Sequence, residues 1–425
     1  MRNKYLAATS CLLAALALGV TACGGDDDEG GGGGSGSGQT AEEGKNIKIY
    51  SSLPLQGASR VQTEAMVNGM KLALEQAGNK AGSHSITYES LDDSTAQAGS
   101  WTPEAESANA LKAAQDEATG VYVGPFNSGA AKVSIPILSE AGVPQISPAN
   151  TYVGLTTNEP GSEPGEPDKY YPTGDRTYTR IVPRDTIQAA ALVTLMKQDG
   201  CTKVAMANDK EVYGAGLARV IELSAKEQQL EITSNDAIDK NAANYRSLAQ
   251  KAKGAGADCF VYAGITANNA VQLYKDFAAA LPDAKLYGPD GVAETGFVSE
   301  KDGGIPAELN PRVKVTVATL APDQYPPEGQ EFFKQFTEKY GVDNPDPYAI
   351  YGYEAMKLAL DAIERSGTGE KADIKKALFE TKDRQSVLGT YSIDENGDTT
   401  LTDYGVYKVV DGALEFDQTI KAAAQ

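Results

Sequence analysis

Short apolar runs alternate along this chain with longer segments in which apolar residues recur every three or four positions. A short apolar run bounded by turn residues is typical of a buried strand, and the longer spacing is typical of one face of a helix. Strands that alternate with helices form parallel sheets. The predicted strands fall into two sets of five, at residues 47–50, 86–91, 121–123, 143–146 and 178–182, and at residues 203–207, 231–233, 258–263, 286–288 and 313–319.

The two sets share a short motif at their third strand. Residues 121–124 read VYVG and residues 261–264 read VYAG, and in each case a strand ends there and a helix follows. Two similar α/β lobes imply a cleft between the carboxyl ends of their strands, where open α/β sheets bind ligands. We therefore predict an α/β fold with two doubly wound, Rossmann-like lobes joined by a multi-strand hinge.

The stretch after the third strand contains the first candidates for ligand binding. A helix is expected from about Ser128, although Pro136 within it should kink or shorten it. With Ser128 as its N-cap, its first turn would present free N–H groups that suit a carboxylate. A second polar loop, ending at Thr151, should leave the next strand at the same sheet edge. Asn127, Ser128 and Thr151 could equally be ordinary capping and turn residues.

The segments between and after the two sets are less regular. Residues 152–177 are rich in proline, glycine and acids, and are predicted to form a long surface loop. Beyond residue 320, three helices should precede strands at 390–393 and 405–410, which are joined through turn-prone residues 394–398. We expect the chain to cross between lobes more than once, with lobe 1 at 45–180 plus about 320–386 and lobe 2 at 181–319 plus about 387–420.

The amino terminus has the features of an export signal. Residues 1–22 combine two basic residues with a short apolar run and small residues, a run too short for a membrane span. Residues 20–23 read VTAC, which resembles a bacterial lipobox and predicts lipidation of Cys23; an ordinary cleaved signal is the alternative. Residues 23–44 are predicted to be a flexible Gly/Ser/Asp tether. We expect a folded body anchored to the outer face of the membrane through Cys23.

Export also bears on the remaining cysteines. With Cys11 in the signal and Cys23 lipidated, Cys201 and Cys259 are left as a pair in an oxidising compartment. They lie just before the first strand and at the start of the third strand of the second set, and these two strands are neighbours in a flavodoxin-like sheet. A disulfide at the sheet edge opposite the cleft is expected, with two buried free thiols as the alternative.

Composition argues against several classes of function. A formal net charge of −20 disfavours binding to nucleic acid or to an anionic surface. The single histidine, His84, lies in a polar segment and is expected to be exposed, so Ser-His or Cys-His catalysis has no base and no metal cluster is apparent. No phosphate-binding glycine motif is present. We predict a binding protein that is not an enzyme and needs no cofactor or metal.

Five motifs in order carry a resemblance to a known family. They read LDD at 91–93, GPFNSG at 124–129, ISPANT at 146–151, DKEVYGAGLA at 209–218 and GPDG at 288–291. With them the chain resembles, over almost all of its mature length, the substrate-binding proteins of ABC transporters in the leucine/isoleucine/valine-binding family. The resemblance implies the type I periplasmic binding protein fold, permease partners and a monomer.

The resemblance also implies particular ligand contacts. Ser128 and Thr151, helped by the backbone of Ala149, would hold the carboxylate and ammonium of an amino acid, and Tyr213 and Asp290 would close over the ammonium. The candidates for the pocket that holds the ligand's side chain are Asn127, Phe126 and Ile265, with Trp101 and residues 52–60. Two features differ from leucine binders of the family, which have Glu where this chain has Asp290 and an aromatic residue in the segment here occupied by 264–266. The ligand is expected to be a branched-chain or related polar amino acid, with a short-chain amide, an aromatic acid or a sensor role as alternatives.

Overall fold

The first sheet of the computed structural model, which describes residues 44–421, has six strands in the order β2-β3-β1-β6-β7-β8. All neighbours in it are parallel except the short β2, which pairs with β3 antiparallel. The strands are β1 (Asn46–Leu53), β2 (Lys80–Ala81), β3 (His84–Asp92), β6 (Thr119–Val123), β7 (Gln145–Ser147) and β8 (Tyr178–Arg180).

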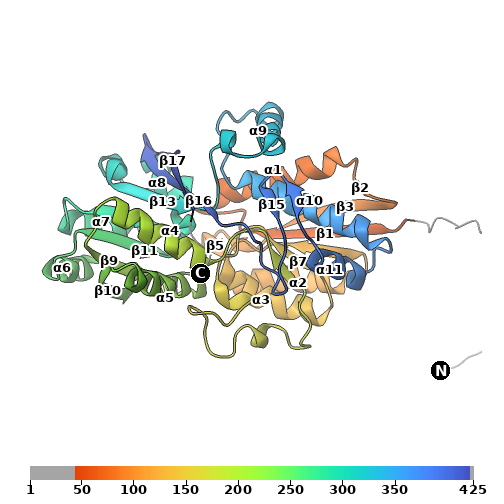
Figure 1. The fold of residues 1–425 in the computed structure, drawn as a ribbon, viewed down its shortest axis with the longest axis horizontal. Helices are drawn as coiled ribbons and strands as arrows, with labels where there is room; N and C mark the ends of the chain where they lie inside the picture. Colours follow the sequence, from red (N-terminus) through yellow and green to blue (C-terminus); the bar gives the residue numbers. More distant parts are fainter. Residues whose placement is uncertain (1–43, 422–425) are drawn as a thin grey trace, which may run out of the picture. The chain divides into compact units, whose positions relative to one another are not determined.

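Helices cover both faces of this sheet, as Figure 1 shows, with α1 and α10 on one side and α2 and α3 on the other. The contact between α1 and α10 depends on small residues, because a Cβ at Gly69 would lie 2.3 Å from the carbonyl oxygen of Ala349. The helix α9 packs on α1, since Tyr340 donates to the carbonyl of Asn68. The helices are α1 (Arg60–Gln76), α2 (Pro103–Gln115), α3 (Ser128–Glu140), α9 (Pro327–Tyr340), α10 (Ala349–Ser366) and α11 (Lys371–Phe379).

The second sheet has seven strands in the order β10-β9-β11-β12-β13-β16-β17. The first five run parallel, and β16 and β17 add antiparallel strands at one edge. The strands are β9 (Lys203–Asn208), β10 (Glu231–Ala237), β11 (Cys259–Ala263), β12 (Lys285–Gly288), β13 (Val313–Val317), β16 (Asp403–Val410) and β17 (Ala413–Lys421). Its helices are α4 (Asp185–Gln198), α5 (Val212–Glu227), α6 (Arg246–Gly254), α7 (Ala270–Ala280) and the short α8 (Thr295–Val298).

The five main strands follow the same order in both sheets. Numbered along the chain within each set, the order is second, first, third, fourth, fifth in both β3-β1-β6-β7-β8 and β10-β9-β11-β12-β13. In a doubly wound sheet of this order, right-handed crossovers place the first connecting helix on one face and the next two on the other. The prediction of two doubly wound α/β lobes is therefore confirmed.

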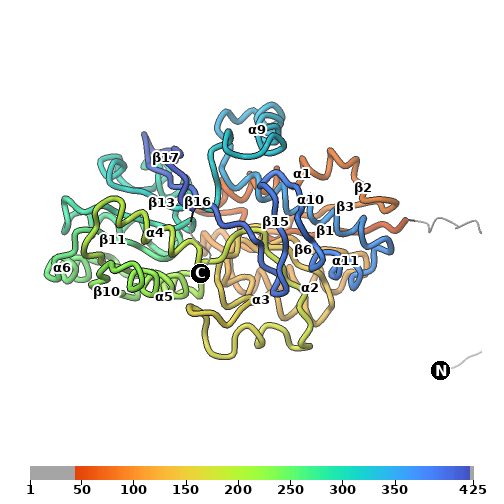
Figure 2. Tube along the Cα trace, in the orientation of Figure 1, coloured from red at the N-terminus to blue at the C-terminus, as the bar shows by residue number. Residues whose placement is uncertain are grey.

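The chain passes between the two sheets three times, and the crossings can be followed in Figure 2. It leaves the first sheet between β8 and α4, returns between β13 and α9, and leaves again between β15 (Gly389–Tyr391) and β16. The strands predicted at 390–393 and 405–410 correspond to β15 and β16, but β15 pairs with β14 (Arg384–Ser386) and β16 lies in the second sheet. We propose that the lobes divide at these crossings.

The loop predicted at 152–177 is exposed over much of its length, as expected, but part of it is buried. It holds two 3-10 turns, η1 (Val153–Leu155) and η2 (Asp168–Tyr170), and its apolar residues form a small core with α3. The carboxylate of the buried Glu166 accepts hydrogen bonds from the hydroxyls of Tyr152 and Tyr170, both at 2.5 Å. Tyrosine hydroxyls and a carboxylate can be buried together when they are hydrogen-bonded to one another. The proline and acid content of the segment does not reveal such pairing.

Two smaller expectations need correction. His84 is buried, and its Nδ1 accepts from the backbone N–H of Lys45 at 3.0 Å, so it is not the exposed residue expected. The helix α3 continues through Pro136 to Glu140 without being shortened.

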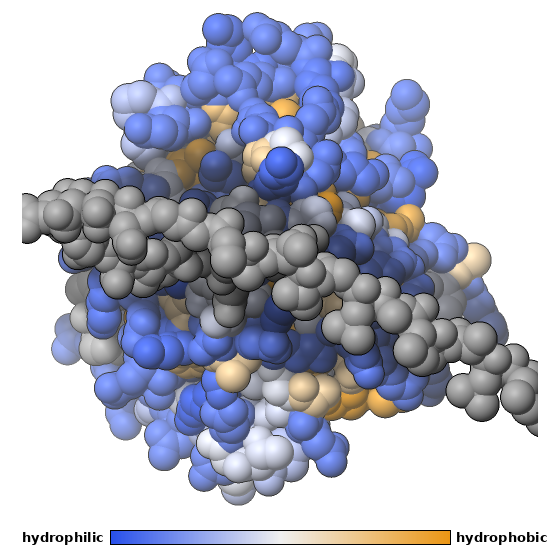
Figure 3. Space-filling view, turned by 90° about the vertical axis from the view of Figure 1, so that its right-hand side faces the viewer, coloured by the Kyte–Doolittle hydropathy of each residue, from blue (hydrophilic) through white to orange (hydrophobic). Residues whose placement is uncertain are grey.

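The surface of the described residues is mostly hydrophilic. Only four large apolar side chains are exposed there, Val61, Leu111, Leu223 and Val342, and they are far apart in the chain. The face drawn in Figure 3 agrees, since hydrophobic residues show on it only as small separate areas. No helix among residues 44–421 has the length and apolar content needed to cross a membrane.

Candidate functional site

A small cavity of about 30 Å³ lies at the carboxyl ends of strands from both sheets. The loops after β6 and β7 line it from the first lobe, and those after β9, β11 and β12 line it from the second. The eight main residues predicted to bind ligand line this cavity together with Trp101 and three others, whereas none of the candidate residues 52–60 does. The lining residues are Trp101, Phe126, Asn127, Ser128, Gly129, Ala149, Thr151, Glu211, Tyr213, Ile265, Asp290 and Gly291.

The first turn of α3 forms the floor on the side of the first lobe. Asn127, and not Ser128 as expected, is the N-cap, and neither side chain makes a capping hydrogen bond. The hydroxyl of Ser128 accepts instead from the N–H of Tyr152 at 3.4 Å, and the buried Oδ1 of Asn127 has no hydrogen-bond partner among the described residues. These polar groups are therefore not used for capping. The N–H groups of a first helical turn favour an anionic group at this end of the cavity.

Asp290 provides negative charge on the opposite side. Its Oδ1 accepts from the hydroxyl of Tyr213 at 2.7 Å, and its Oδ2 accepts from Tyr348 at 3.3 Å. Burial raises the pKa of the Asp290 carboxyl. A cation placed against this carboxylate would oppose that shift, since an opposite charge favours the ionised form. The arrangement suits a ligand ammonium group.

A second buried acid, Asp185, lies directly behind the cavity and was not singled out from the sequence. It is the first residue of α4 and its backbone N–H donates to the carbonyl of Thr151 at 2.9 Å. Its carboxylate oxygens are buried without a hydrogen-bond partner among the described residues. Burial first, and then the charge of Asp290, raises the pKa of Asp185 well above its usual range. A carboxyl group in such a place is favoured in its neutral form.

Glu211 was also missed, although it lies in one of the motifs read from the sequence. Its Oε2 comes within 3.1 Å of the position that a Cβ on Gly129 would occupy, and Cζ2 of Trp101 comes within 2.5 Å of the same point. An acid from the second lobe and an indole from the first therefore meet over the start of α3. Only glycine at position 129 leaves room for both.

Asp209 links the two loops of the second lobe that carry Glu211 and Ile265. Its Oδ1 accepts from the N–H of Glu211 at 3.1 Å, and its Oδ2 accepts from the N–H of Ile265 at 3.0 Å and from Asn268 at 2.9 Å. Burial raises the pKa of Asp209 to about 6. One carboxyl group thus positions both Glu211 and Ile265 at the cavity.

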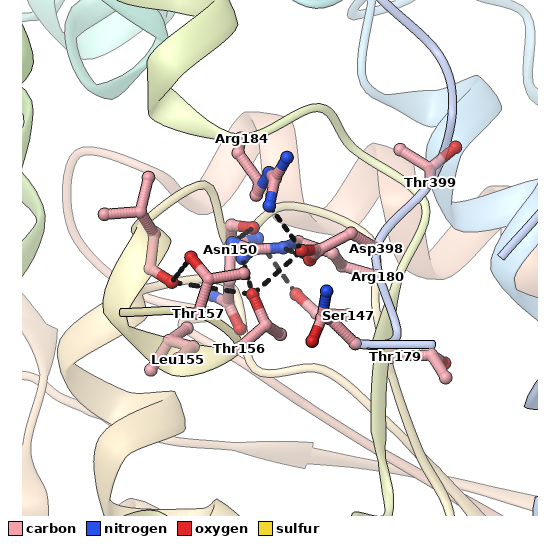
Figure 4. Close-up of polar contacts among 12 residues, drawn as sticks. Ser147, Asn150, Leu155, Thr156, Thr157, Thr179, Arg180, Arg184, Asp398 and Thr399 are labelled. Carbon is pink, nitrogen blue, oxygen red and sulfur yellow. Dashed lines mark hydrogen bonds and ion pairs between the residues drawn. The ribbon is translucent and has the colours of Figure 1, made fainter. Parts of the chain in front are cut away.

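A buried ion pair fixes the loop that carries Ala149 and Thr151. The guanidinium of Arg180, fully buried on β8, donates to Asp398 at 2.6 Å, to the carbonyl of Asn150 at 3.0 Å and to that of Tyr152 at 2.8 Å. Figure 4 shows Arg180 between the loop after β7 and the segment that contains Asp398. The two carbonyls flank Thr151, so Arg180 holds that residue in place from both sides.

Asp398 connects the same loop to the crossing that leads to β16. Its Oδ2 accepts from the hydroxyl of Thr156 at 3.0 Å and from Arg184 at 3.1 Å. The N–H of Arg180 donates to the carbonyl of Gly397 at 2.8 Å, which adds a backbone link. The hinge segment and the Thr151 loop are therefore parts of one hydrogen-bonded cluster.

The lobes also touch on either side of the cavity. Gln62 of α1 donates to the carbonyl of Ala293 at 3.2 Å, and Arg219 of α5 donates to the carbonyl of Gly161 at 2.6 Å and 3.1 Å. Because Gly161 belongs to the 152–177 loop, that loop reaches from the first lobe to the second. The cavity is thus enclosed by both lobes.

The disulfide lies at the opposite edge of the second sheet. Cys201 and Cys259 are bonded to each other with their Cα atoms 5.8 Å apart. They precede or begin β9 and β11, whose other ends lead to Glu211 and Ile265 at the cavity. Within residues 44–421, the one group of side chains near enough to share a metal ion is Cys201, Asp258 and Cys259, and its sulfurs are in the disulfide.

Comparisons with known proteins agree with the fold. Residues 46–413 match the sequence model of the family described as "Periplasmic binding protein". The chain is 26% identical over 292 residues to a Leu/Ile/Val-binding protein homolog 1 of Brucella melitensis, covering 68% of this chain and 72% of that one. These are solute-binding proteins and not enzymes.

Two solved structures show the same fold. A leucine-binding protein LivK of Thermotoga maritima aligns with a TM-score of 0.75 and 22% identity, covering 88% of this chain and 99% of that one. A solute-binding protein of an ABC transporter from Rhodopseudomonas palustris, in complex with p-hydroxybenzoic acid, aligns with a TM-score of 0.71 and 20% identity, covering 89% and 97%.

Proposed function

This chain belongs to the periplasmic binding protein family, and we propose that it closes its two lobes on a small amino acid and delivers that ligand to an ABC permease. The observation that carries the proposal is the charge distribution of this cavity. A helix N-terminus lies on one side, and a carboxylate held by two tyrosine hydroxyls lies on the other. A zwitterion presents the complementary pair of charges.

The residues take the roles that the sequence suggested. Ser128, Thr151 and the backbone of Ala149 hold the ligand carboxylate, and Tyr213 and Asp290 hold its ammonium. Phe126, Asn127, Ile265 and Trp101 surround the side chain, which is a branched-chain or related polar one.

A thermal-shift screen of twenty amino acids, short-chain amides and aromatic acids tests the ligand class. A ligand at a hundred times its Kd stabilises the folded protein by about 2.7 kcal/mol, which raises Tm measurably. We expect a shift with amino acids and a smaller one with their amides or with the acids that lack an ammonium group. Absence of a shift with every amino acid would contradict the proposal.

An aromatic acid is the second candidate, supported by Trp101 and Phe126 in the cavity and by the structural neighbour with p-hydroxybenzoic acid. Charge argues against it, because Asp290 and Glu211 both line the cavity and no Lys, Arg or His does. A monoanion without a cationic group would leave both carboxylates unpaired. A shift with hydroxybenzoate and none with amino acids would favour this candidate.

The location proposed is the outer face of the membrane, with Cys23 lipidated and residues 24–44 as the tether. Work outside the cytoplasm is the rule in the family, and the lipobox-like residues 20–23 support the anchor. Residues 1–43 lie outside the described part of the chain. Cys23→Ser should move the protein from the membrane fraction to the soluble exported fraction, and unchanged membrane retention would exclude this anchor. A kinase encoded beside the gene, in place of permease and ATPase subunits, would favour the sensor role.

A further inference from the structure

The cavity is lined by more polar groups than an aliphatic amino acid can provide with hydrogen-bond or charge partners. The ammonium of such a ligand would bind Asp290, and its carboxylate would bind the start of α3. Glu211 is then left without a positively charged or N–H partner, since no hydrogen bond or ion pair reaches its carboxylate from the described residues. Glu211 is half-buried, and closure of the lobes on a ligand would remove water from its carboxylate, which is costly unless the carboxylate is paired.

Asn127 gives a second, independent indication of an unfilled hydrogen bond. The residue is only 9% exposed, it lines the cavity, and its Oδ1 has no partner among residues 44–421. Buried polar side-chain atoms nearly always have a hydrogen-bond partner in native proteins. The ligand is the group that the lobes enclose here, so it is the natural donor.

Glu211 lies on a different loop from the acid that would hold the ligand's ammonium, and the same-charge carboxylate of the ligand cannot pair with it, so the ligand's side chain is left as its partner. The carboxylate of Glu211 lies over Gly129 next to the indole of Trp101, on a different loop from Asp290. Aromatic faces attract cationic nitrogens, and carboxylates accept their N–H groups. Leucine or isoleucine would place hydrocarbon against this carboxylate.

We propose that Glu211 is a specificity-determining residue that accepts a hydrogen bond from the ligand's side chain, so that the ligand is an amino acid whose side chain carries an N–H donor. This inference rests on the proposed function, because it presumes that an amino acid occupies the cavity. The donor is a positively charged nitrogen or an amide nitrogen, and both present the same N–H group to Glu211.

Calorimetric titrations with ornithine, glutamine and leucine, which are similar in size, test the inference. We expect the wild-type protein to bind ornithine or glutamine at least about tenfold more tightly than leucine. Glu211→Leu should weaken the donor-bearing ligand about tenfold and leave leucine unchanged or tighter. Glu211→Gln distinguishes a positively charged nitrogen from an amide nitrogen. It should weaken binding of the ligand with a cationic side chain and largely leave binding of the amide unchanged.

Controls make the outcomes distinct. Glu222→Leu, on the exposed side of the same helix α5, should leave all three affinities unchanged. Asp290→Asn should weaken all three alike, because every amino acid has the ammonium group. If wild type prefers leucine, or if Glu211→Leu weakens the three ligands equally, the inference is wrong while the proposed function stands. If none of the twenty amino acids binds, the proposed function itself fails.

Discussion

Removing the negative charge of Asp398 should weaken ligand binding although this residue does not line the cavity. Asp398 pairs with Arg180, and the guanidinium of Arg180 also holds the carbonyls of Asn150 and Tyr152 on either side of Thr151. In Asp398→Asn the buried guanidinium keeps its charge and loses its carboxylate partner. The guanidinium and the Thr151 loop are then free to shift.

The magnitude follows from the burial of the pair. The side chains of Arg180 and Asp398 are 0% and 2% exposed, and breaking such a pair from one side costs about 3–5 kcal/mol of folding free energy. The cost in binding should be smaller, about a tenfold rise in Kd, because the loop keeps its other contacts. Arg180→Lys should act in the same direction, since a single ammonium cannot reach all the acceptors of the guanidinium.

A second buried pair in the same chain offers a matched control. Glu354 accepts from Arg384 at 2.7 Å, and their side chains are 1% and 14% exposed, but neither lines the cavity. Glu354→Gln should lower Tm and leave Kd unchanged when binding is measured calorimetrically well below the lowest Tm. If Asp398→Asn lowers Tm with no change in Kd, the cluster serves folding alone and the argument for positioning is refuted.

Three further predictions concern the site, the disulfide and pH. Ser128→Ala and Asp290→Asn should each weaken amino-acid binding by about 1.5–3 kcal/mol while circular dichroism and Tm show an intact fold; unchanged affinity would remove that residue from the site. Breaking the Cys201–Cys259 bond with a reductant, or replacing both residues by serine, should lower the free energy of unfolding by up to about 4 kcal/mol, because the bond closes a loop with a sequence separation of 58. The Kd of the ligand should stay unaltered, because the bond lies at the sheet edge far from the cavity. Burial raises the pKa of Glu106 to about 7 from 4.5, so the folded state holds this proton more tightly than the unfolded state does. The free energy of unfolding should therefore fall as pH rises between about 4.5 and 7. Asp93, which is fully buried and whose charge would lie near Glu106, should add to this fall, and Asp93→Asn should reduce the difference in Tm between about pH 5 and pH 8; an equal difference in both proteins would contradict the sign.

Much of the fold could be predicted because it is encoded in local periodicity. A buried parallel strand needs a continuous apolar run, and a helix on its face needs apolar residues on one side, so the βα alternation of both lobes was readable directly. Once strands are parallel, their carboxyl-end loops must meet at one edge. That is why Ser128 after β6 and Thr151 after β7 could be assigned to one site, and why Cys201 and Cys259 could be assigned to the opposite edge.

The resemblance to a known family supplied what periodicity could not. Tyr213 and Asp290 come from the second lobe, and no local pattern states which loop of one lobe faces which loop of the other. Their positions in motifs of known order did so, and the structure places both at the cavity.

Only the tertiary structure decided the environment of individual polar groups. His84 and Asp185 are both buried, although their neighbours in sequence are polar, because the residues that cover or pair with them are remote in the chain. Arg180 and Asp398 are more than two hundred residues apart, and Glu211 meets Gly129 across the two lobes. Burial and hydrogen bonding depend on such distant contacts, whereas the sequence by itself determines the elements and the sheet edge to which their loops lead.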